Sequence, residues 1–484
     1  MKPDQRLFED ERPRQTKIVA TVGPACSDSS QLSELLRRGV DVFRINTAHG
    51  KRSQHETGME AIRRAGRDVG RPVAILVDLA GPKIRLGELA GGQLDCVAGA
   101  SVRFVPGRTP AGPSDLVTTY EPLIDELKVG SRVMLADGTV ALDVTDIEGN
   151  AATCTVVQPG VVRNGQGVNV PRLKLNVPAL DEKDRETAAW AARVGVDFIG
   201  LSFVRSAEDV HDLKMLIEEH GSEARVIAKI EKPEALDNLE AIIEETDGVM
   251  IARGDLGVEI DIARVPIVQK RIIAACRRSH TPVIVATQML DSMQHSRLPT
   301  RAEATDVANA ILDGADACML SGETAIGEYP GDAVAMMNRI AKATERDYRP
   351  DEVGETETKK DFGLPRITHG VASAAGLLAE TLNAKMIVVA SRTGATARAI
   401  SNNRLFVPTV GVSDSEATLR QMCLFWGVTP LSSCPTEDPQ RIFEYAVDHA
   451  RNTGYLNSGD HVVMIAGTGL RVSKHNMIVV HEID

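Results

Sequence analysis

The sequence predicts an α/β protein in three parts, and three observations support this prediction. Short apolar runs alternate with helical patterns eight times along the chain. This alternation is broken once, between residues 86 and 177, by a stretch rich in Gly, Val, Thr and Asp. A shorter α/β series follows a polar segment at residues 350–365. We therefore expect a (β/α)8 TIM barrel, an all-β lid domain inserted after strand 3, and a C-terminal doubly wound α/β domain.

The eight predicted barrel strands are apolar runs of the length expected for buried parallel strands. Each is followed by a segment with the 3.6-residue period of a helix that has one apolar face. The strands span residues 16–22, 41–46, 72–79, 197–203, 225–231, 248–253, 282–287 and 317–320. The main helices span residues 29–38, 181–194, 207–220, 233–245, 265–279, 301–312 and 332–345. Eight units in one series favour a barrel, and an open doubly wound sheet is the alternative.

The other two parts have their own patterns. Turn dipeptides such as Pro106-Gly107 and Asp137-Gly138 punctuate short alternating runs in the inserted stretch, which is typical of an all-β domain. After the polar segment, apolar runs at residues 386–390, 407–412, 428–431, 461–466 and 477–480 alternate with helical stretches. The predicted domains are residues 1–85 with 178–345 for the barrel, 86–177 for the lid and 346–484 for the C-terminal domain.

The composition is that of a globular protein without a membrane span. Hydrophobic residues make up 43% and charged residues 25%, while only 3% are aromatic, so aliphatic side chains fill the core. A formal net charge of −12 argues against nucleic-acid binding. The seven cysteines form no CxxC pair, which indicates reduced thiols. Residues 1–15 lack the apolar region of a signal peptide, and we expect a cytoplasmic protein with no membrane partner.

Polar side chains gather at the predicted carboxyl ends of the strands, where barrel enzymes keep their reactive groups. Random placement would seldom put a polar group at that end of so many strands. The residues concerned are Arg44, Asn46, His49, Asp78, Lys83, Arg85, Lys229, Glu231, Arg253, Asp255, Thr287, Gln288, Ser321 and Glu323.

Lys229 and Glu231 are two residues apart on the fifth strand, so their side chains point to the same face. Glu231 and Asp255, from neighbouring strands, supply the hard oxygen ligands that Mg²⁺ or Mn²⁺ prefers. Either carboxylate alone is more often a helix cap or a salt-bridge partner. Their pairing beside a lysine favours a metal site.

Phosphoryl transfer is the chemistry that this set of side chains fits. Arg44, Lys83, Arg85 and Lys229 would converge on one face, as a phosphoryl group in transfer requires, although any single cation is more often a solvated surface charge. Amides near Gly254 and Asp255 could hold a substrate carboxylate if a helical turn begins there. Thr287 could lie near the reacting carbon, although a threonine at a strand end is usually structural.

These residues together resemble the pyruvate kinase family over essentially the whole chain. The motifs that carry the resemblance begin at the first strand and continue to the eighth, in order. They are TKIVATVGP from Thr16, RINTAHG from Arg44, AKIE from Ala228, ARGDLGVE from Ala252, ATQMLDSM from Ala286, PTRAE from Pro299 and SGETAIGEYP from Ser321. No single motif would be enough, but so many in order are highly specific.

The resemblance implies transfer of a phosphoryl group from phosphoenolpyruvate to ADP, which gives pyruvate and ATP in the last step of glycolysis. By this resemblance, Lys229 and Arg44 would bind the phosphoryl group, and Glu231 and Asp255 would bind the divalent ion. Gly254, Asp255 and Thr287 would contact the substrate, with Thr287 on the path of enolate protonation. Asn46, His49 and Arg85 would lie on the nucleotide side. The β-rich insertion would be a mobile lid that excludes water, and the assembly a homotetramer.

The chain departs from the family at its monovalent-ion site. Potassium-requiring members carry Ser, Thr and Glu where this chain has Ala48, Leu79 and Lys83. Of the usual ligands only Asn46 and Asp78 remain, so K⁺ would be under-coordinated. The ammonium of Lys83 could supply the missing positive charge, and we therefore predict that activity does not require K⁺. The alternative is that Lys83 points to solvent.

Two further sites match the family less well. Gln166 stands where many relatives have a lid lysine near the nucleotide, so that contact cannot be transferred to this chain. Ser391, Thr393, Gly394 and Thr396 join a strand to a helix and could hold an effector phosphate, although a plain turn is nearly as good an explanation. The loop from Gly467 suggests a monophosphate or nucleotide effector, or none.

Two other functions remain open at this point. A metal-dependent barrel aldolase or lyase acting on pyruvate or oxaloacetate would share the carboxylate-held metal, but would not need the lid or so many phosphate-facing cations. A catalytically inactive sensor would bind an effector through the C-terminal domain. The intact set of Lys229, Glu231, Asp255 and Thr287 argues against the sensor.

Overall fold

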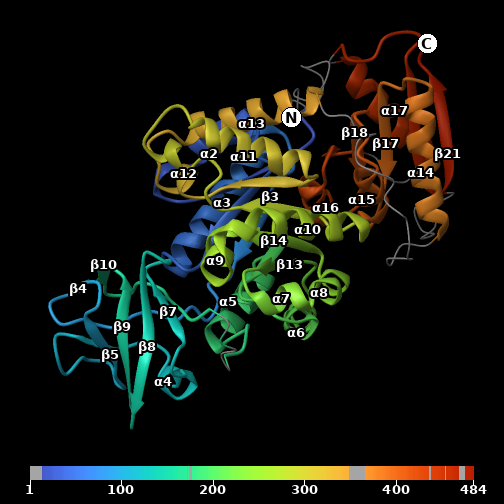
Figure 1. Ribbon diagram of the computed structural model, residues 1–484. Helices are drawn as coiled ribbons and strands as arrows, with labels where there is room; N and C mark the ends of the chain where they lie inside the picture. The colour runs from blue at the N-terminus through green and yellow to red at the C-terminus, as the bar shows by residue number, and fades with distance from the viewer. Residues whose placement is uncertain are drawn as a thin grey trace.

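The computed structural model describes residues 14–171, 173, 177–347, 366–434, 438–452, 454–467 and 475–484. Eight parallel strands close into a barrel in the order β1-β16-β15-β14-β13-β12-β3-β2 (Figure 1). Their bounds are β1 Lys17–Thr21, β2 Val42–Asn46, β3 Ala74–Asp78, β12 Phe198–Leu201, β13 Arg225–Ile230, β14 Gly248–Ala252, β15 Val283–Ala286 and β16 Ala317–Leu320. Each lies within its predicted range, so the predicted barrel is confirmed and the open sheet is excluded.

Helices surround the barrel, and α2 (Ser29–Arg38), α5 (Glu182–Arg193) and α11 (Arg301–Leu312) begin at side-chain caps. The first, α2, starts at a capping box of Asp28 and Gln31 and stops at Gly39, whose φ of 130° few other residues adopt. The others are α3 Arg52–Val69, α6 Ala207–Glu219, α9 Arg253–Glu259, α10 Val265–Arg278, α12 Gly322–Ala325 and α13 Pro330–Asp347. The predicted helix 233–245 is wrong in one respect: it is broken at Asn238 into α7 (Pro233–Asp237) and α8 (Leu239–Glu245).

Alternation along the strands divides the barrel core into two layers. Residues such as Val42, Leu76 and Ile227 pack together inside the barrel, while their chain neighbours pack against the helices. Side chains two residues apart on a strand point the same way. Arg44, Asp78 and Lys229 therefore continue the interior rows and emerge together at the carboxyl ends of β2, β3 and β13.

The inserted domain is a separate β structure with its own apolar core, which confirms the predicted all-β lid. Its six-stranded sheet has the order β11-β7-β8-β9-β5-β6, and a two-stranded sheet pairs β10 with β4. Figure 1 shows it projecting from one end of the barrel. The strands are β4 Gln93–Cys96, β5 Ser101–Phe104, β6 Asp115–Leu116, β7 Arg132–Leu135, β8 Val140–Glu148, β9 Ala151–Gln158, β10 Gly160–Arg163 and β11 Val168–Asn169, with one short helix, α4 (Leu123–Glu126).

The C-terminal domain is a five-stranded sheet in the order β19-β18-β17-β20-β21, with only β21 antiparallel to its neighbour. Its strands are β17 Met386–Ala390, β18 Thr409–Val412, β19 Val428–Pro430, β20 His461–Gly467 and β21 His475–Glu482. Helices α14 (Arg366–Thr381) and α15 (Ala395–Asn402) share an apolar core with one face, and α17 (Pro439–Asn452) with the other. Helix α16 spans Glu416–Gln421. The domain is thus doubly wound, as predicted. Among the described residues, no helix is both long and apolar enough to cross a membrane.

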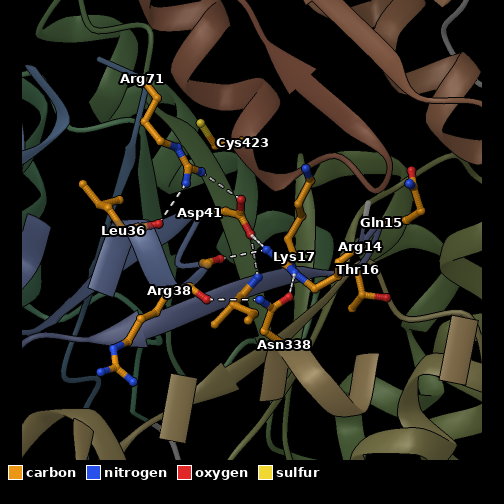
Figure 2. Close-up of polar contacts among 12 residues, drawn as sticks. Arg14, Gln15, Thr16, Lys17, Leu36, Arg38, Asp41, Arg71, Asn338 and Cys423 are labelled. Carbon is orange, nitrogen blue, oxygen red and sulfur yellow. Dashed lines mark hydrogen bonds and ion pairs between the residues drawn. The ribbon is translucent and has the colours of Figure 1, made fainter. Parts of the chain in front are cut away.

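A buried carboxylate ties the amino-terminal end of the barrel together (Figure 2). Asp41 accepts hydrogen bonds from Arg14 at 2.8 Å, from Arg71 at 3.0 Å and from the amide of Ile18 at 2.9 Å. Arg71 also donates to the carbonyl of Leu36 at 3.2 Å. This network joins β1, β2 and the loop before β3, at the end of the barrel that faces the C-terminal domain.

We expect Asp41→Ala to destabilise the protein strongly, because it would leave two buried guanidinium groups without their carboxylate. Breaking such a buried pair costs about 3–5 kcal/mol. The matched control is Asp143→Ala in the lid, whose ion pair with Arg132 is largely exposed and should cost under about 1 kcal/mol. Urea unfolding measures both. Equal losses for the two variants would contradict this reading of Asp41.

Candidate active site

Lys229 lies at the centre of the polar groups at the carboxyl end of the barrel. Its ammonium is 2.9 Å from Oε1 of Glu231, 3.2 Å from Oδ1 of Asp78, and donates to Oγ of Ser202 at 2.6 Å. Burial opposes the charge on Lys229, but the carboxylates of Asp78 and Glu231 outweigh burial and raise the pKa of the ammonium. Lys229 is therefore a permanent cation rather than a proton acceptor.

Asp78 also holds Arg44, from the neighbouring strand. Two nitrogens of the Arg44 guanidinium reach the same oxygen, Oδ2 of Asp78, with Nη2 at 2.6 Å and Nε at 2.7 Å. Its Nη1 donates to Oγ1 of Thr21 at 3.2 Å. Burial raises the pKa of Asp78, but Lys229 and Arg44 overcome that effect and hold it below its ordinary value. One ionised carboxylate thus fixes two cations at the same strand ends.

Lys83 connects the lid to the barrel. Its ammonium lies 3.2 Å from Oδ1 of Asp255 and 3.2 Å from Oδ1 of Asp137 in the lid. Burial disfavours the charge, yet the two carboxylates raise the pKa of Lys83. Lys83 is therefore not the solvated surface lysine of the alternative interpretation. No ion pair with Asp78 is found for Lys83 among the residues described.

Thr287 and Gly254 meet across two neighbouring strand ends. The amide of Gly254, in the first turn of α9, donates to Oγ1 of Thr287 at 2.8 Å. Oγ1 of Thr287 in turn donates to the carbonyl of Ala286 at 2.7 Å. A helical turn does begin at Arg253, as the substrate-carboxylate hypothesis requires.

Glu231 and Asp255 fit a hard divalent cation. Glu231 is buried, its Oε2 accepts from the amide of Phe203 at 2.9 Å, and its Oε1 is paired with the ammonium of Lys229 at 2.9 Å. Burial, together with the nearby charge of Asp255, raises the pKa of Glu231. A cation such as Mg²⁺ or Mn²⁺, bound between the buried carboxylate of Glu231 and the partly exposed carboxylate of Asp255, would relieve their mutual repulsion. No cluster of three or more His, Cys, Asp or Glu occurs among the residues described, so substrate and water oxygens would complete the shell.

Comparison with known proteins assigns the family. The family model for the pyruvate kinase barrel domain matches residues 13–334, and the model for the pyruvate kinase alpha/beta domain matches residues 369–481. The chain belongs to the pyruvate kinase family. It is 41% identical over 470 residues to the pyruvate kinase of Corynebacterium glutamicum, covering 97% of each chain. It is 41% identical over 472 residues to that of Mycobacterium tuberculosis, covering 97% of this chain and 98% of the relative.

A solved structure agrees with this assignment. The crystal structure of a pyruvate kinase from Cryptosporidium parvum superposes with a TM-score of 0.91 at 32% identity, covering 97% of this chain and 96% of that one. The chain therefore transfers a phosphoryl group from phosphoenolpyruvate to ADP, forming pyruvate and ATP in glycolysis. This decides against the aldolase or lyase alternative and against the inactive sensor.

The residues predicted for the nucleotide bond to groups outside the Lys229 network, although Asn46 lies opposite Asp78 in the pairing of β2 with β3. His49 is exposed after β2, and Oδ1 of Asn46 accepts from the amide of Ala48 at 3.2 Å. Arg85 lies at the root of the lid, where Nη1 donates to the carbonyl of Gly165 at 3.0 Å. Gln166 bonds within the lid, through its Oε1, to the amide of Arg163 at 2.7 Å.

The predicted effector turn lies at the start of α15, where it contacts the barrel. Ser391 and Thr396 are buried, Thr393 is exposed, and Gly394 has a φ of 77°. The carbonyl of Thr393 accepts a hydrogen bond from Arg225, the first residue of β13, at 2.5 Å. Residues 468–474, which include most of the loop after Gly467, lie outside the described residues, as does the predicted linker.

Sequence reasoning missed several members of the site. Ser202 and Thr21 follow or end strands, so the rule that found the other residues could have found them. Asp137 could not be found in this way, because it reaches Lys83 only through the lid fold. Asp137 and its neighbour Ala136 both have left-handed backbone, with φ of 53° and 51°.

We expect Lys229→Gln to lower kcat by roughly 10³-fold, since it removes a preorganised charge from the transferred group. The matched control is Lys214→Gln on α6, whose ammonium lies 3.7 Å from Asp247 outside the site. Steady-state ATP formation, with circular dichroism to verify folding, compares the two. A folded Lys229→Gln enzyme with the wild-type rate would refute the central role of Lys229.

Proposed function

We propose that Lys229 and Arg44 bind the phosphoryl group as it passes from phosphoenolpyruvate to ADP. The observation that supports this most strongly is the pair of cations fixed by Asp78 at adjacent points of the barrel, at 3.2 Å and 2.6 Å. Both side chains are held in position by Asp78 before substrate arrives. Such preorganisation lowers the barrier, because no reorganisation is needed as negative charge develops.

The divalent ion is proposed to be Mg²⁺ or Mn²⁺, bound by Glu231 and Asp255. When bound, it supplies neutralisation of charge on the phosphoryl oxygens and the developing enolate. The amide of Asp255 orients the substrate carboxylate. Gly254, whose amide donates to Oγ1 of Thr287 at 2.8 Å, contacts the substrate through a backbone that no side chain covers, and the hydroxyl of Thr287 lies beside the carbon that is protonated.

ADP is proposed to bind between barrel and lid, near Asn46, His49 and Arg85. Arg85 supports this placement, because it lies where the lid joins the barrel and donates to the carbonyl of Gly165 in the lid. Closure of the lid over the barrel would exclude water, so that the phosphoryl group passes to ADP and not to water. Gln166 bonds within the lid to the amide of Arg163, so no lysine reaches the nucleotide from this position.

The enzyme is further proposed to work without K⁺. Both oxygens of Asp78 already contact cations, Lys229 and Arg44, and the side chain of Leu79 offers no oxygen. Lys83 places a permanent positive charge at the same strand ends, held by Asp255. These contacts support the proposal that the ammonium of Lys83 takes the place of the monovalent ion. Besides Asp78, Asn46 is the ligand of the family's ion pocket that this chain keeps.

We expect kcat for ATP formation to be the same within about twofold in buffers with and without KCl, since an ammonium already provides the charge. The triple variant Ala48→Ser, Leu79→Thr and Lys83→Glu should acquire a requirement for K⁺, while Lys83→Glu alone should lose most activity. A coupled assay with phosphoenolpyruvate and ADP in tetramethylammonium buffer measures this. If the wild-type rate collapses without K⁺ and KCl restores it, the proposal fails, while ATP formation still supports the reaction.

The proposed assembly is a homotetramer in the cytoplasm. Two groups of exposed apolar side chains support self-association. One lies on the C-terminal domain, where Leu377 on α14 is 67% exposed beside β21. The other lies near α10, where Ile262 is 76% and Ile267 67% exposed. Light scattering that gives the mass of a single chain would contradict the proposal.

The domain boundaries and the effector site are proposed as predicted from the sequence. The barrel comprises 1–85 and 178–345, the lid 86–177 and the C-terminal domain 346–484, which agrees with the strands that end at Asp78, begin at Gln93, end at Asn169 and begin at Phe198.

A phosphorylated effector would bind the turn of Ser391, Thr393, Gly394 and Thr396. The buried hydroxyl of Ser391 has no hydrogen-bond partner among the residues that the structure describes, which supports this. Calorimetric titration with nucleoside monophosphates and sugar phosphates tests it, and no heat from any would refute it.

A further inference from the structure

The backbone at the end of β15 is strained. Thr287 has a φ of 68° and Gln288 a φ of 54°, both in the left-handed region. A β-branched residue is rare there, and such a conformation costs about 1–3 kcal/mol. It persists only where the surrounding structure holds it, so the groups that hold Thr287 matter to the position of its hydroxyl.

Arg253 provides that hold. Its Nη2 donates to the carbonyl of Thr287 at 2.8 Å, and its Nε to the carbonyl of Ala286 at 3.2 Å. Its Nη1 donates to Oδ1 of Asp306 on α11 at 2.8 Å, which orients the guanidinium plane. The side chain of Arg253 is only 12% exposed. Two successive carbonyls of the strained segment are thus fixed by one rigid, buried fork.

The same residue lies next to the other partner of the threonine. Arg253 directly precedes Gly254, whose amide donates to Oγ1 of Thr287 at 2.8 Å. The backbone amide of Gly254 in α9 and the side chain of Arg253 therefore hold Thr287 from two sides. The hydroxyl of Thr287 has little freedom, because the carbonyl of Thr287, the carbonyl of Ala286 and Oγ1 of Thr287 all accept hydrogen bonds.

We propose that Arg253 is a positioning residue for Thr287, and that it sets the hydroxyl at the point where the enolate is protonated. The proposal rests on the role proposed above for Thr287. Arg253 itself points at the backbone and Asp306, so it acts through the threonine and not on the substrate. Lysine cannot replace it, since one ammonium cannot reach two carbonyls and the Asp306 carboxylate in a plane.

The experiment is a double-mutant cycle of Arg253→Lys and Thr287→Ala. It has two readouts: kcat for ATP formation, and exchange of the pyruvate methyl protons with D₂O followed by NMR. A displacement of about 1 Å at a reacting group can cost about 100-fold, so we expect Arg253→Lys to lower the proton exchange by 10- to 100-fold. KM for ADP should be unchanged. In the Thr287→Ala enzyme, Arg253→Lys should lower the proton exchange little further, because the effects of substitutions at residues that act as one unit are not additive.

Arg63→Lys is the matched control. Arg63 has the same kind of contacts at the other end of the barrel, donating to the carbonyl of Val73 at 2.7 Å and to Asp197 at 2.8 Å. Its replacement should lower thermal stability but leave the proton exchange unchanged. If Arg253→Lys does not fold, Asp306→Asn takes its place in the cycle, because it loosens the guanidinium without removing it.

A coupled loss in the cycle with an unaffected Arg63→Lys enzyme supports the proposal. Wild-type exchange in Arg253→Lys, while Thr287→Ala is impaired, overturns the role of Arg253 and leaves that of Thr287 standing. Full additivity shows that Arg253 acts elsewhere and also overturns the proposal. Wild-type exchange in Thr287→Ala overturns the role of Thr287 itself, and with it the proposal.

Discussion

The carboxylate of Asp78 is the group on which the arrangement of the site depends. It lies buried at the end of β3 and binds Arg44 from β2 and Lys229 from β13. Space for it exists because Gly200 on β12 has no side chain, and a Cβ there would lie 3.0 Å from Oδ1 of Asp78. A buried carboxylate is costly unless it is paired. Here the pairing also holds two phosphoryl-binding cations in place.

Two contacts extend from this centre to the outer domains. Lys83 lies between Asp137 of the lid and Asp255 of the proposed metal site, so lid position and metal site share one ammonium. At the other end of β13, Arg225 donates to Thr393 in the C-terminal domain, while Lys229 lies near the carboxyl end of the same strand. The strand that carries Lys229 is therefore in direct contact with the proposed effector turn.

The barrel, the order of its strands and the central residues could be predicted because parallel strands obey simple rules. Apolar run lengths located the strands within a few residues, and the carboxyl-end rule brought Glu231 and Asp255 to adjacent strands. The two-residue period placed Lys229 beside Glu231. The break at Asn238 was missed because the apolar period continues across it. The partners of Lys83 and Arg253 were missed because Asp137 and Asp306 come from distant segments, and no local pattern encodes such contacts.

The most direct test of the account is kcat for ATP formation in Asp78→Asn. The amide keeps the shape but presents no charge to Arg44 and Lys229, so kcat should fall by about 100-fold or more. Asp197→Asn is the comparison, since Asp197 is an equally buried carboxylate that binds Arg63 and Arg420 at the opposite end of the barrel. It should lose stability and keep its kcat. A folded Asp78→Asn enzyme with the wild-type kcat would contradict the account.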